Sequence, residues 1–113
     1  MKFRDTIVTL LIDKKDNLWI GTQSGLNIIN LNDFDNNTYQ IKHYFFDNKL
    51  LSGDDILSLY QDISGKIWVG TKAKGLYVYN GSNFNKINIK KDDFEVTSIH
   101  SISEDDSGNL WMS

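Results

Sequence analysis

The stretch "GKIWVGT" (residues 65–71) decides the fold, because similar stretches recur in the chain. An earlier copy reads "DNLWIGT" (residues 16–22), and a third, "GNLWMS" (residues 108–113), stands at the C-terminal end. The three tryptophans are separated by 49 and 43 residues (68 − 19 and 111 − 68). A spacing of about 40–50 residues is the period of β-propeller blades, so the sequence predicts a repeat of this kind.

The copies align without gaps well before the tryptophan. Residues 7–22 match residues 56–71, and residues 99–113 continue the register. We interpret the recurring tryptophans as wedges between blades and the recurring aspartates as caps of turns, since a position occupied in every unit is usually structural. The recurring positions are Asp13, Asp62 and Asp105, Trp19, Trp68 and Trp111, Gly21 and Gly70, and Gly65 and Gly108.

Each unit contains four short apolar runs rich in Ile, Val, Thr, Tyr and Trp, which is typical of β-strands. The links "DISGK" and "DDSGN" place Asp first and Gly fourth, which favours a type I turn that ends in a left-handed residue. In the first copy Asp16 replaces this Gly, and we expect a small local cost there. Alternate residues such as Val69 and Trp68 are both apolar, which predicts sheets that are covered on both faces.

The sequence therefore predicts an all-β fold, a β-propeller fragment of about two and a half four-stranded antiparallel blades. We expect blade 1 at about residues 5–46, blade 2 at about residues 54–89, and the start of blade 3 at about residues 96–113. Because closed propellers have at least about four blades, we expect a longer array. The alternative is that the 113 residues form a complete, self-closing fold. Uncovered end faces and edges predict that the isolated chain self-associates.

Composition excludes several classes of function. The chain has a net charge of −3 and scattered lysines, which argues against a nucleic-acid partner. It has no cysteine, which rules out disulfides and thiolate catalysis. No run reaches the roughly 20 apolar residues of a membrane span, and the apolar run near the N-terminus is too short for a signal peptide. We expect no membrane contact within these residues and any export signal outside them.

Residues suited to catalysis or metal binding are sparse. His43 and His100 are 57 positions apart (100 − 43) and lack partners at metal-ligand spacing. The repeated aspartates lack the ligand spacing of a calcium loop, and no nucleophile elbow or phosphate-binding loop is present. We therefore expect no catalytic residue, no metal and no cofactor.

Ligand contacts are expected on the variable loops at residues 32–39 and 89–96, because loops on a rigid scaffold carry binding more often than strands do. The candidate side chains are four tyrosines, which offer aromatic platforms. The alternative interpretation is that the loops are ordinary solvated segments and the tyrosines are buried. The candidates are Tyr39, Tyr44, Tyr77 and Tyr79.

The segment "LLSGDDILSLYQDISGKIWVGTKAKGLYVYNGSNF" (residues 50–84) resembles the two-component regulator propeller repeat, and the resemblance covers nearly the whole chain. Two features depart from the family pattern: Ser24-Gly25 and Lys74-Gly75 replace a frequent Gly-Gly pair, and the third copy lacks the Gly-Thr after its tryptophan. The matching positions are Leu51, Ser52, Ile56, Leu59, Asp62, Gly65, Ile67, Trp68, Gly70, Thr71, Gly75, Leu76 and Tyr77.

This resemblance implies the extracytoplasmic sensor of a membrane-anchored hybrid histidine kinase, or of a related protein with a diguanylate cyclase output. It implies a dimeric, non-enzymatic domain that binds a small molecule or oligosaccharide, with the kinase or cyclase outside these residues. The alternatives are the propeller domain of a polysaccharide-acting enzyme and a purely protein-binding propeller. Fold alone does not choose among them.

Overall fold

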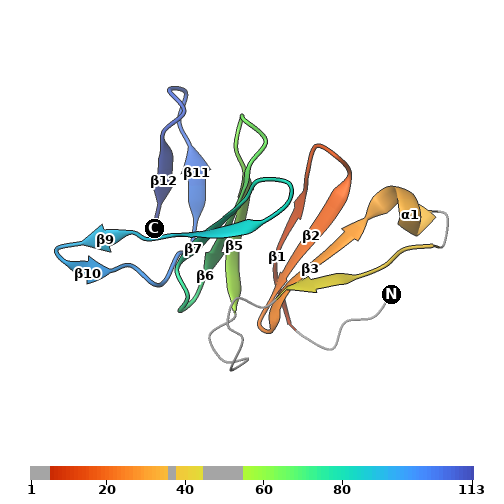
Figure 1. Ribbon diagram of the computed structural model, residues 1–113, viewed down its shortest axis with the longest axis horizontal. Coiled ribbons are helices and arrows are strands. Elements are labelled where there is room, and N and C mark those ends of the chain that lie inside the picture. Colours follow the sequence, from red (N-terminus) through yellow and green to blue (C-terminus); the bar gives the residue numbers. More distant parts are fainter. Residues whose placement is uncertain (1–5, 36–37, 45–54) are drawn as a thin grey trace.

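Three antiparallel sheets carry the repeated sequence, and they stand side by side as a fan (Figure 1). The computed structural model describes residues 6–35, 38–44 and 55–113. Residues 5, 46 and 54, which are predicted blade limits, and Leu51 and Ser52 of the family pattern lie outside this description, as does part of the predicted loop 32–39.

The first two sheets each contain four strands in sequence order. The third sheet has two strands, so the prediction of antiparallel blades, two of them four-stranded, is confirmed. The first sheet contains β1 (Ile7–Ile12), β2 (Asn17–Thr22), β3 (Gly25–Asn30) and β4 (Lys42–Tyr44). The second contains β5 (Ile56–Gln61), β6 (Ile67–Thr71), β7 (Leu76–Tyr79) and β8 (Phe84–Ile87), and the third β11 (Ile102–Glu104) and β12 (Leu110–Met112).

Two further elements were not predicted from the sequence: one connects two strands of the first sheet, and the other follows the second sheet. Helix α1 (Leu31–Asp35) follows β3, and the Asn30 side chain caps it by accepting hydrogen bonds from the Asn32 and Asp33 N–H groups. A hairpin of β9 (Lys90–Lys91) and β10 (Phe94–Glu95) precedes the third sheet. Its two turn residues, Asp92 and Asp93, both have positive φ (52° and 67°), as a two-residue type I′ turn requires.

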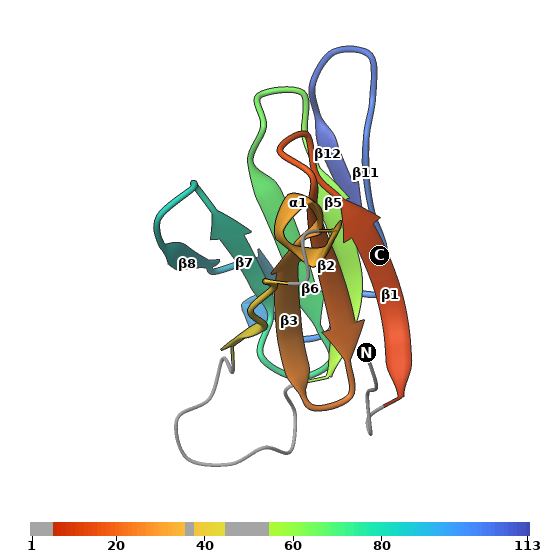
Figure 2. The same cartoon turned by 90° about the vertical axis from the view of Figure 1, so that its right-hand side faces the viewer.

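The three hairpins β1–β2, β5–β6 and β11–β12 point to the same side of the molecule in both views (Figures 1 and 2). The fourth turn residue is left-handed in each: φ is 62° at Asp16, 96° at Gly65 and 83° at Gly108. The predicted turn is therefore confirmed, including the unfavourable conformation of Asp16, a residue that pays a steric cost where Gly does not.

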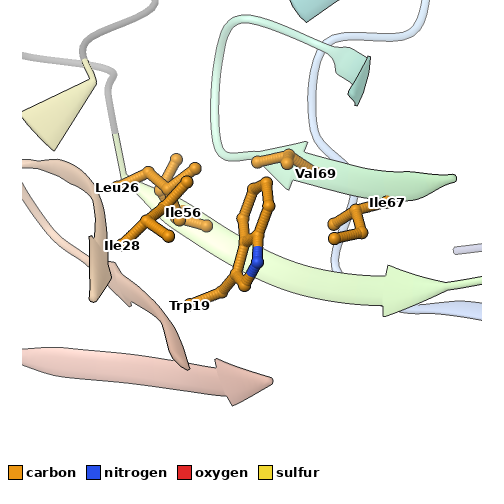
Figure 3. Packing of buried hydrophobic residues seen from close by; sticks show 6 residues of the cluster. All are labelled: Trp19, Leu26, Ile28, Ile56, Ile67 and Val69. Carbon is orange, nitrogen blue, oxygen red and sulfur yellow. The ribbon is translucent and has the colours of Figure 1, made fainter. Parts of the chain in front are cut away.

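Trp19 and Trp68 lie on the face of their sheet that points toward the next sheet, and Trp111 has the same position in the third sheet. Trp19 is 1% exposed and packs in a cluster with Ile56, Ile67 and Val69 of the second sheet (Figure 3). Trp68 is half-buried beside the shorter third sheet, and Trp111 is 63% exposed. The predicted wedge role is thus seen at Trp19, where the next sheet is complete with four strands.

A glycine two residues after the tryptophan allows the next sheet to pack closely. A Cβ built on Gly21 would lie 2.6 Å from Thr9 Cγ2 of the same sheet and 2.7 Å from Ile56 Cγ2 of the next. One built on Gly70 would overlap Ser58 Oγ and lie 2.8 Å from Ile99 Cγ2. Ile56 and Ile99 begin the following repeats and are 0% and 2% exposed. The glycine is therefore required because the leading isoleucine of the next repeat, together with Thr9 or Ser58 of the same sheet, occupies the space of its side chain.

Backbone hydrogen bonds fix the second of these joints. The Ile99 N–H donates to the Thr71 carbonyl (2.9 Å), and the Gly75 N–H donates to the Thr97 carbonyl (2.8 Å). The Ser58 hydroxyl donates to the Ile99 carbonyl at 3.0 Å. Ser113 takes the glycine position in the third copy, and its Oγ lies 2.6 Å from Ser101 Oγ.

The threonine after this glycine closes the next turn, β2–β3 or β6–β7, at the end of the sheet opposite the β1–β2 and β5–β6 hairpins. The Thr22 hydroxyl donates to the Gly25 carbonyl (2.9 Å) and accepts from the Ser24 N–H (3.0 Å). Thr71 does the same with Gly75 (2.8 Å) and Lys74 (2.9 Å). Both threonines are 0% exposed, so their hydroxyls need these partners.

We predict that Gly21→Ala lowers the free energy of unfolding by about 1–3 kcal/mol, because the new methyl group overlaps Ile56. Ile56→Ala alone removes a buried side chain and costs about 2–5 kcal/mol. Urea unfolding of both single variants and the double variant measures the coupling. We expect the double variant to be more stable than additivity predicts by about 1 kcal/mol; strict additivity would contradict a joint made by this contact.

Candidate functional site

A groove of about 480 Å³ opens on the hairpin side of the molecule, between the first two sheets. The β1–β2 hairpin, the β5–β6 hairpin and the β7–β8 turn form its walls, and Figure 1 shows this turn between the two hairpins. A volume of this size is typical of small-molecule sites. Its lining residues are Asp13, Lys14, Lys15, Gln61, Ser64, Gly65, Lys66, Ile67, Tyr79, Asn80 and Gly81.

A carboxylate at the base of each hairpin holds the turn and the tryptophan together. Asp13 Oδ2 accepts from the Trp19 indole N–H (2.9 Å), while Oδ1 accepts from the Lys15 and Asn17 N–H groups (2.8 and 2.9 Å). Asp62 binds Trp68 in the same way (2.8 Å), and Asp105 binds Trp111 (2.9 Å). In all three copies the aspartate therefore accepts hydrogen bonds from its own turn as well as from the indole.

These hydrogen bonds stabilise the charged form of each aspartate. Burial by itself raises the pKa of Asp13 and Asp62, but the hydrogen bonds they accept outweigh it and leave both below the ordinary value. The bond from the Trp111 indole, followed by bonds from Asn109, lowers the pKa of Asp105 to about 2. All three aspartates are therefore ionised at neutral pH.

Gln61 connects the two hairpins across the groove. Its Oε1 accepts from the Lys14 N–H at 3.0 Å, and its Nε2 donates to the Gly65 carbonyl at 3.1 Å. The third wall is fixed by the Tyr79 hydroxyl, which donates to the Gly81 carbonyl at 3.0 Å. The backbone of the groove is thus held by side chains that are already hydrogen-bonded within the protein.

Three of the four candidate tyrosines, Tyr44, Tyr77 and Tyr79, pack on the core between the first two sheets rather than forming an exposed platform. Tyr79 packs edge-on against Trp19 (5.3 Å between ring centroids) and Tyr44 lies 4.9 Å from Phe84, so both belong to the aromatic packing between the first two sheets. Burial, with Tyr44 and Asp13 nearby, raises the pKa of Tyr79. Tyr77 packs on the same core, and Tyr39 is half-buried between α1 and β4. Their contact with a ligand stays a prediction, although Tyr79 also borders the groove.

The variable loops border two further hollows. One, of about 300 Å³, lies beside the predicted loop 32–39 and includes Asp33 and Gln40. The other, of about 470 Å³, lies beside the β9–β10 hairpin and includes Lys90, Lys91 and Ile99. Neither hollow combines two hairpin tips from adjacent sheets, so we take the groove between the first two sheets as the candidate site.

The two histidines lie in different parts of the fold and make different hydrogen bonds. His43 Nδ1 lies against Asn27 Oδ1 at the edge of the first sheet, and His100 uses its backbone N–H to bind the Ser113 carbonyl. Among the described residues, no group of three or more His, Asp or Glu side chains has the arrangement of a metal site. In the same part of the chain, no helix has the length and apolar character needed to cross a membrane.

Lys14, Gln61 and Lys66 were not predicted as site residues. Their signal was present, since Lys14 lies within the predicted turn of the first repeat and Lys66 directly follows that of the second. Consecutive blades place equivalent turns side by side, so residues of such turns meet across each blade boundary.

Comparison with known proteins adds a sequence family. Residues 3–24 and 50–73 match the family model described as two component regulator propeller. The protein named Histidine kinase P4 from Formosa agariphila is 50% identical over 105 residues, which are 93% of this chain and 8% of that protein. This chain thus spans only a small part of the curated relative that it matches.

Two solved structures have the same arrangement of strands. The extracellular domain of the putative hybrid two component system BT3049 from B. thetaiotaomicron superimposes with a TM-score of 0.72 at 26% identity, covering 96% of this chain and 14% of that one. The corresponding domain of BT4673 from the same organism gives a TM-score of 0.70 at 26% identity, covering 98% and 14%.

We predict that Asp62→Asn lowers the free energy of unfolding at pH 7 by about 2–3 kcal/mol, because an amide cannot accept all the hydrogen bonds that the carboxylate accepts. The folded-state pKa of Asp62 is lowered, so this stabilisation is present above the unfolded pKa of about 4 and is lost as pH falls through the folded value. Urea unfolding at pH 7 and near pH 2 should show the difference between variant and parent shrinking with acid. An equal difference at both pH values would contradict the ionised cap.

Proposed function

Because this chain carries two-component regulator propeller repeats, we propose that it is part of the extracytoplasmic, ligand-sensing propeller of a hybrid histidine kinase and that the ligand is a carbohydrate. In this role the chain itself catalyses nothing. It forms one sector of a rigid scaffold that holds ligand-contacting residues, and the kinase lies elsewhere in the protein.

The observation that carries this proposal is the 50% identity to Histidine kinase P4 over 93% of the chain. That value is well above the 26% identity to the two extracellular domains of similar structure. The family match and the two extracellular domains of similar structure support the same type of protein. The carbohydrate ligand is supported only by the family resemblance and by the presence of a groove of small-molecule size.

Signalling by such a sensor requires a difference in affinity. A ligand shifts a dimer between two arrangements only as far as it binds one of them more tightly than the other. Couplings of about 1–3 kcal/mol are typical, which correspond to a shift of about 5- to 150-fold in the equilibrium. A groove whose walls come from two sheets suits this task. If each hairpin is rigid, the groove changes shape when one sheet moves against the other, and the ligand then binds the two arrangements with different affinities.

We predict that the whole protein contains further repeats, a membrane-spanning helix and a histidine kinase, and that an oligosaccharide changes its autophosphorylation rate. The gene sequence around these residues and a phosphorylation assay with an oligosaccharide panel provide the test. A polysaccharide lyase or glycosidase module in the same protein would replace the sensor proposal by the enzyme alternative. No response to any oligosaccharide of the panel would favour the protein-binding alternative.

The 113-residue chain on its own exposes apolar residues on both of its end sheets. These two surfaces correspond to the two that pack together between the first and second sheets. Leu10 and Ile12, which are 58% and 59% exposed, lie on the face of the first sheet that points away from the second. Trp111, 63% exposed, lies on the opposite end. Within the chain, Trp19 packs on the equivalent face of the second sheet, around Val69. We propose that a second copy docks its Trp111 face on the Leu10 face, a head-to-tail contact.

We predict that the isolated chain forms dimers or larger species at micromolar concentration and that Leu10→Lys shifts it toward monomers, because the equivalent residue of the second sheet, Leu59, packs on the core. A charge in the centre of an apolar interface costs several kcal/mol unless it is paired. Ile63→Lys is the matched control, because Ile63 is 82% exposed at a hairpin tip. Light scattering measures the mass; a parent chain that is monomeric, or equal effects of both variants, would contradict this docking.

A further inference from the structure

The groove between the first two sheets is basic in a chain that is acidic overall. Three lysines and one aspartate line it, so the lining has a formal charge of +2 (3 − 1), while the chain as a whole has −3. Lys14, Lys15 and Lys66 are all exposed, and they come from two different hairpins. Positive charges from separate elements therefore converge on one hollow.

These three ammonium groups are available. Within the part of the chain that the structure describes, no carboxylate lies within ion-pair distance of Lys14, Lys15 or Lys66 Nζ. The one acidic lining residue, Asp13, already accepts hydrogen bonds from the Trp19 indole and from Asn17 and Lys15. Its lone pairs are directed at its own hairpin rather than left for a cation.

The chain contains its own comparison for this groove. The same construction recurs between the second and third sheets, where Glu104 takes the place of Gln61. Glu104 Oε1 accepts from the Ile63 N–H at 3.0 Å, as Gln61 Oε1 accepts from the Lys14 N–H at 3.0 Å. The backbone contact that connects adjacent hairpins is therefore the same in both places.

The charges at the two places are opposite. Ile63, Ser64 and Asn109 stand at the positions of Lys14, Lys15 and Lys66, and the connecting amide has become a carboxylate. The four positions thus change from +3 to −1 with no change in the contact between the hairpins. The lysines are not needed to build the joint, so their convergence calls for another reason.

We propose that the groove between the β1–β2 and β5–β6 hairpins binds the oxyanion of a ligand, a carboxylate or sulfate group. Ammonium groups in a half-enclosed groove are screened less by salt than on a convex surface, and they form short charge-assisted hydrogen bonds to oxyanions. The oxyanion site is inferred from the groove alone. That the oxyanion belongs to an acidic saccharide rests on the proposed function.

Calorimetric titration of the whole protein with glucuronate, glucose and sodium sulfate tests the site. We expect glucuronate to bind about tenfold more tightly than glucose, because only glucuronate carries a negative charge that the lysines attract. We expect sulfate to compete with glucuronate, because both carry an oxyanion. Joint substitution of Lys14→Ile, Lys15→Ser and Lys66→Asn, which installs the residues of the second groove, should weaken glucuronate binding by about tenfold or more. Gln61→Glu alone should weaken it too, while keeping the contact to the Lys14 N–H.

The matched control carries Lys72→Gln, Lys74→Gln and Lys86→Gln, which removes the same charge from lysines that line neither the groove nor the two other hollows. It should retain glucuronate affinity to within about twofold, since distant surface charges are screened. Equal loss in control and groove variants, or no binding of either anion, would overturn the proposal. Sulfate binding without any saccharide binding supports the groove and rejects the carbohydrate ligand; glucose binding that ignores the lysines supports the carbohydrate and rejects the groove.

Discussion

The hydrogen bond from each repeated tryptophan to the aspartate six residues before it is the interaction on which the blade depends. The carboxylate binds two backbone N–H groups of the turn with one oxygen and the indole with the other, so one side chain fixes both the hairpin and the ring. A ring oriented in this way presents its apolar face to the next sheet, as Trp19 does against Ile67 and Val69. The polar bond within one sheet thus determines the apolar contact between two.

Much of the fold could be predicted from the repeat. The alternation around Trp68 predicted sheets with two covered faces, and Val69 and Ile67 are indeed buried against Trp19. The turn chemistry predicted the left-handed residues, including Asp16. These features are local or periodic, and for that reason they are written in consecutive residues and repeat at each unit.

Helix α1 and the β9–β10 hairpin were missed, because each occurs once and repetition gave no help. The Asp92–Asp93 turn is a type I′ signal without glycine, which is a weaker pattern than Asn-Gly. The groove was missed for another reason: Lys14 and Gln61 are 47 positions apart and meet only when two sheets are side by side. The tyrosines were attractive as exposed aromatic platforms, yet burial against neighbouring sheets is what their strand positions determine for Tyr44 and Tyr79.

The seat of Ile56 on Gly21 and of Ile99 on Gly70 has an evolutionary consequence. A glycine carries no side chain that must recognise a particular partner, so the same joint accepts whichever unit begins with isoleucine. Units joined in this way are interchangeable, and a gene can duplicate, lose or exchange them without redesigning the boundary. The side chains of Lys14 and Ile63 at the hairpin tips take no part in this glycine contact, since these residues meet the neighbouring hairpin through their backbone N–H groups. Such side chains are free to diversify from one unit to the next.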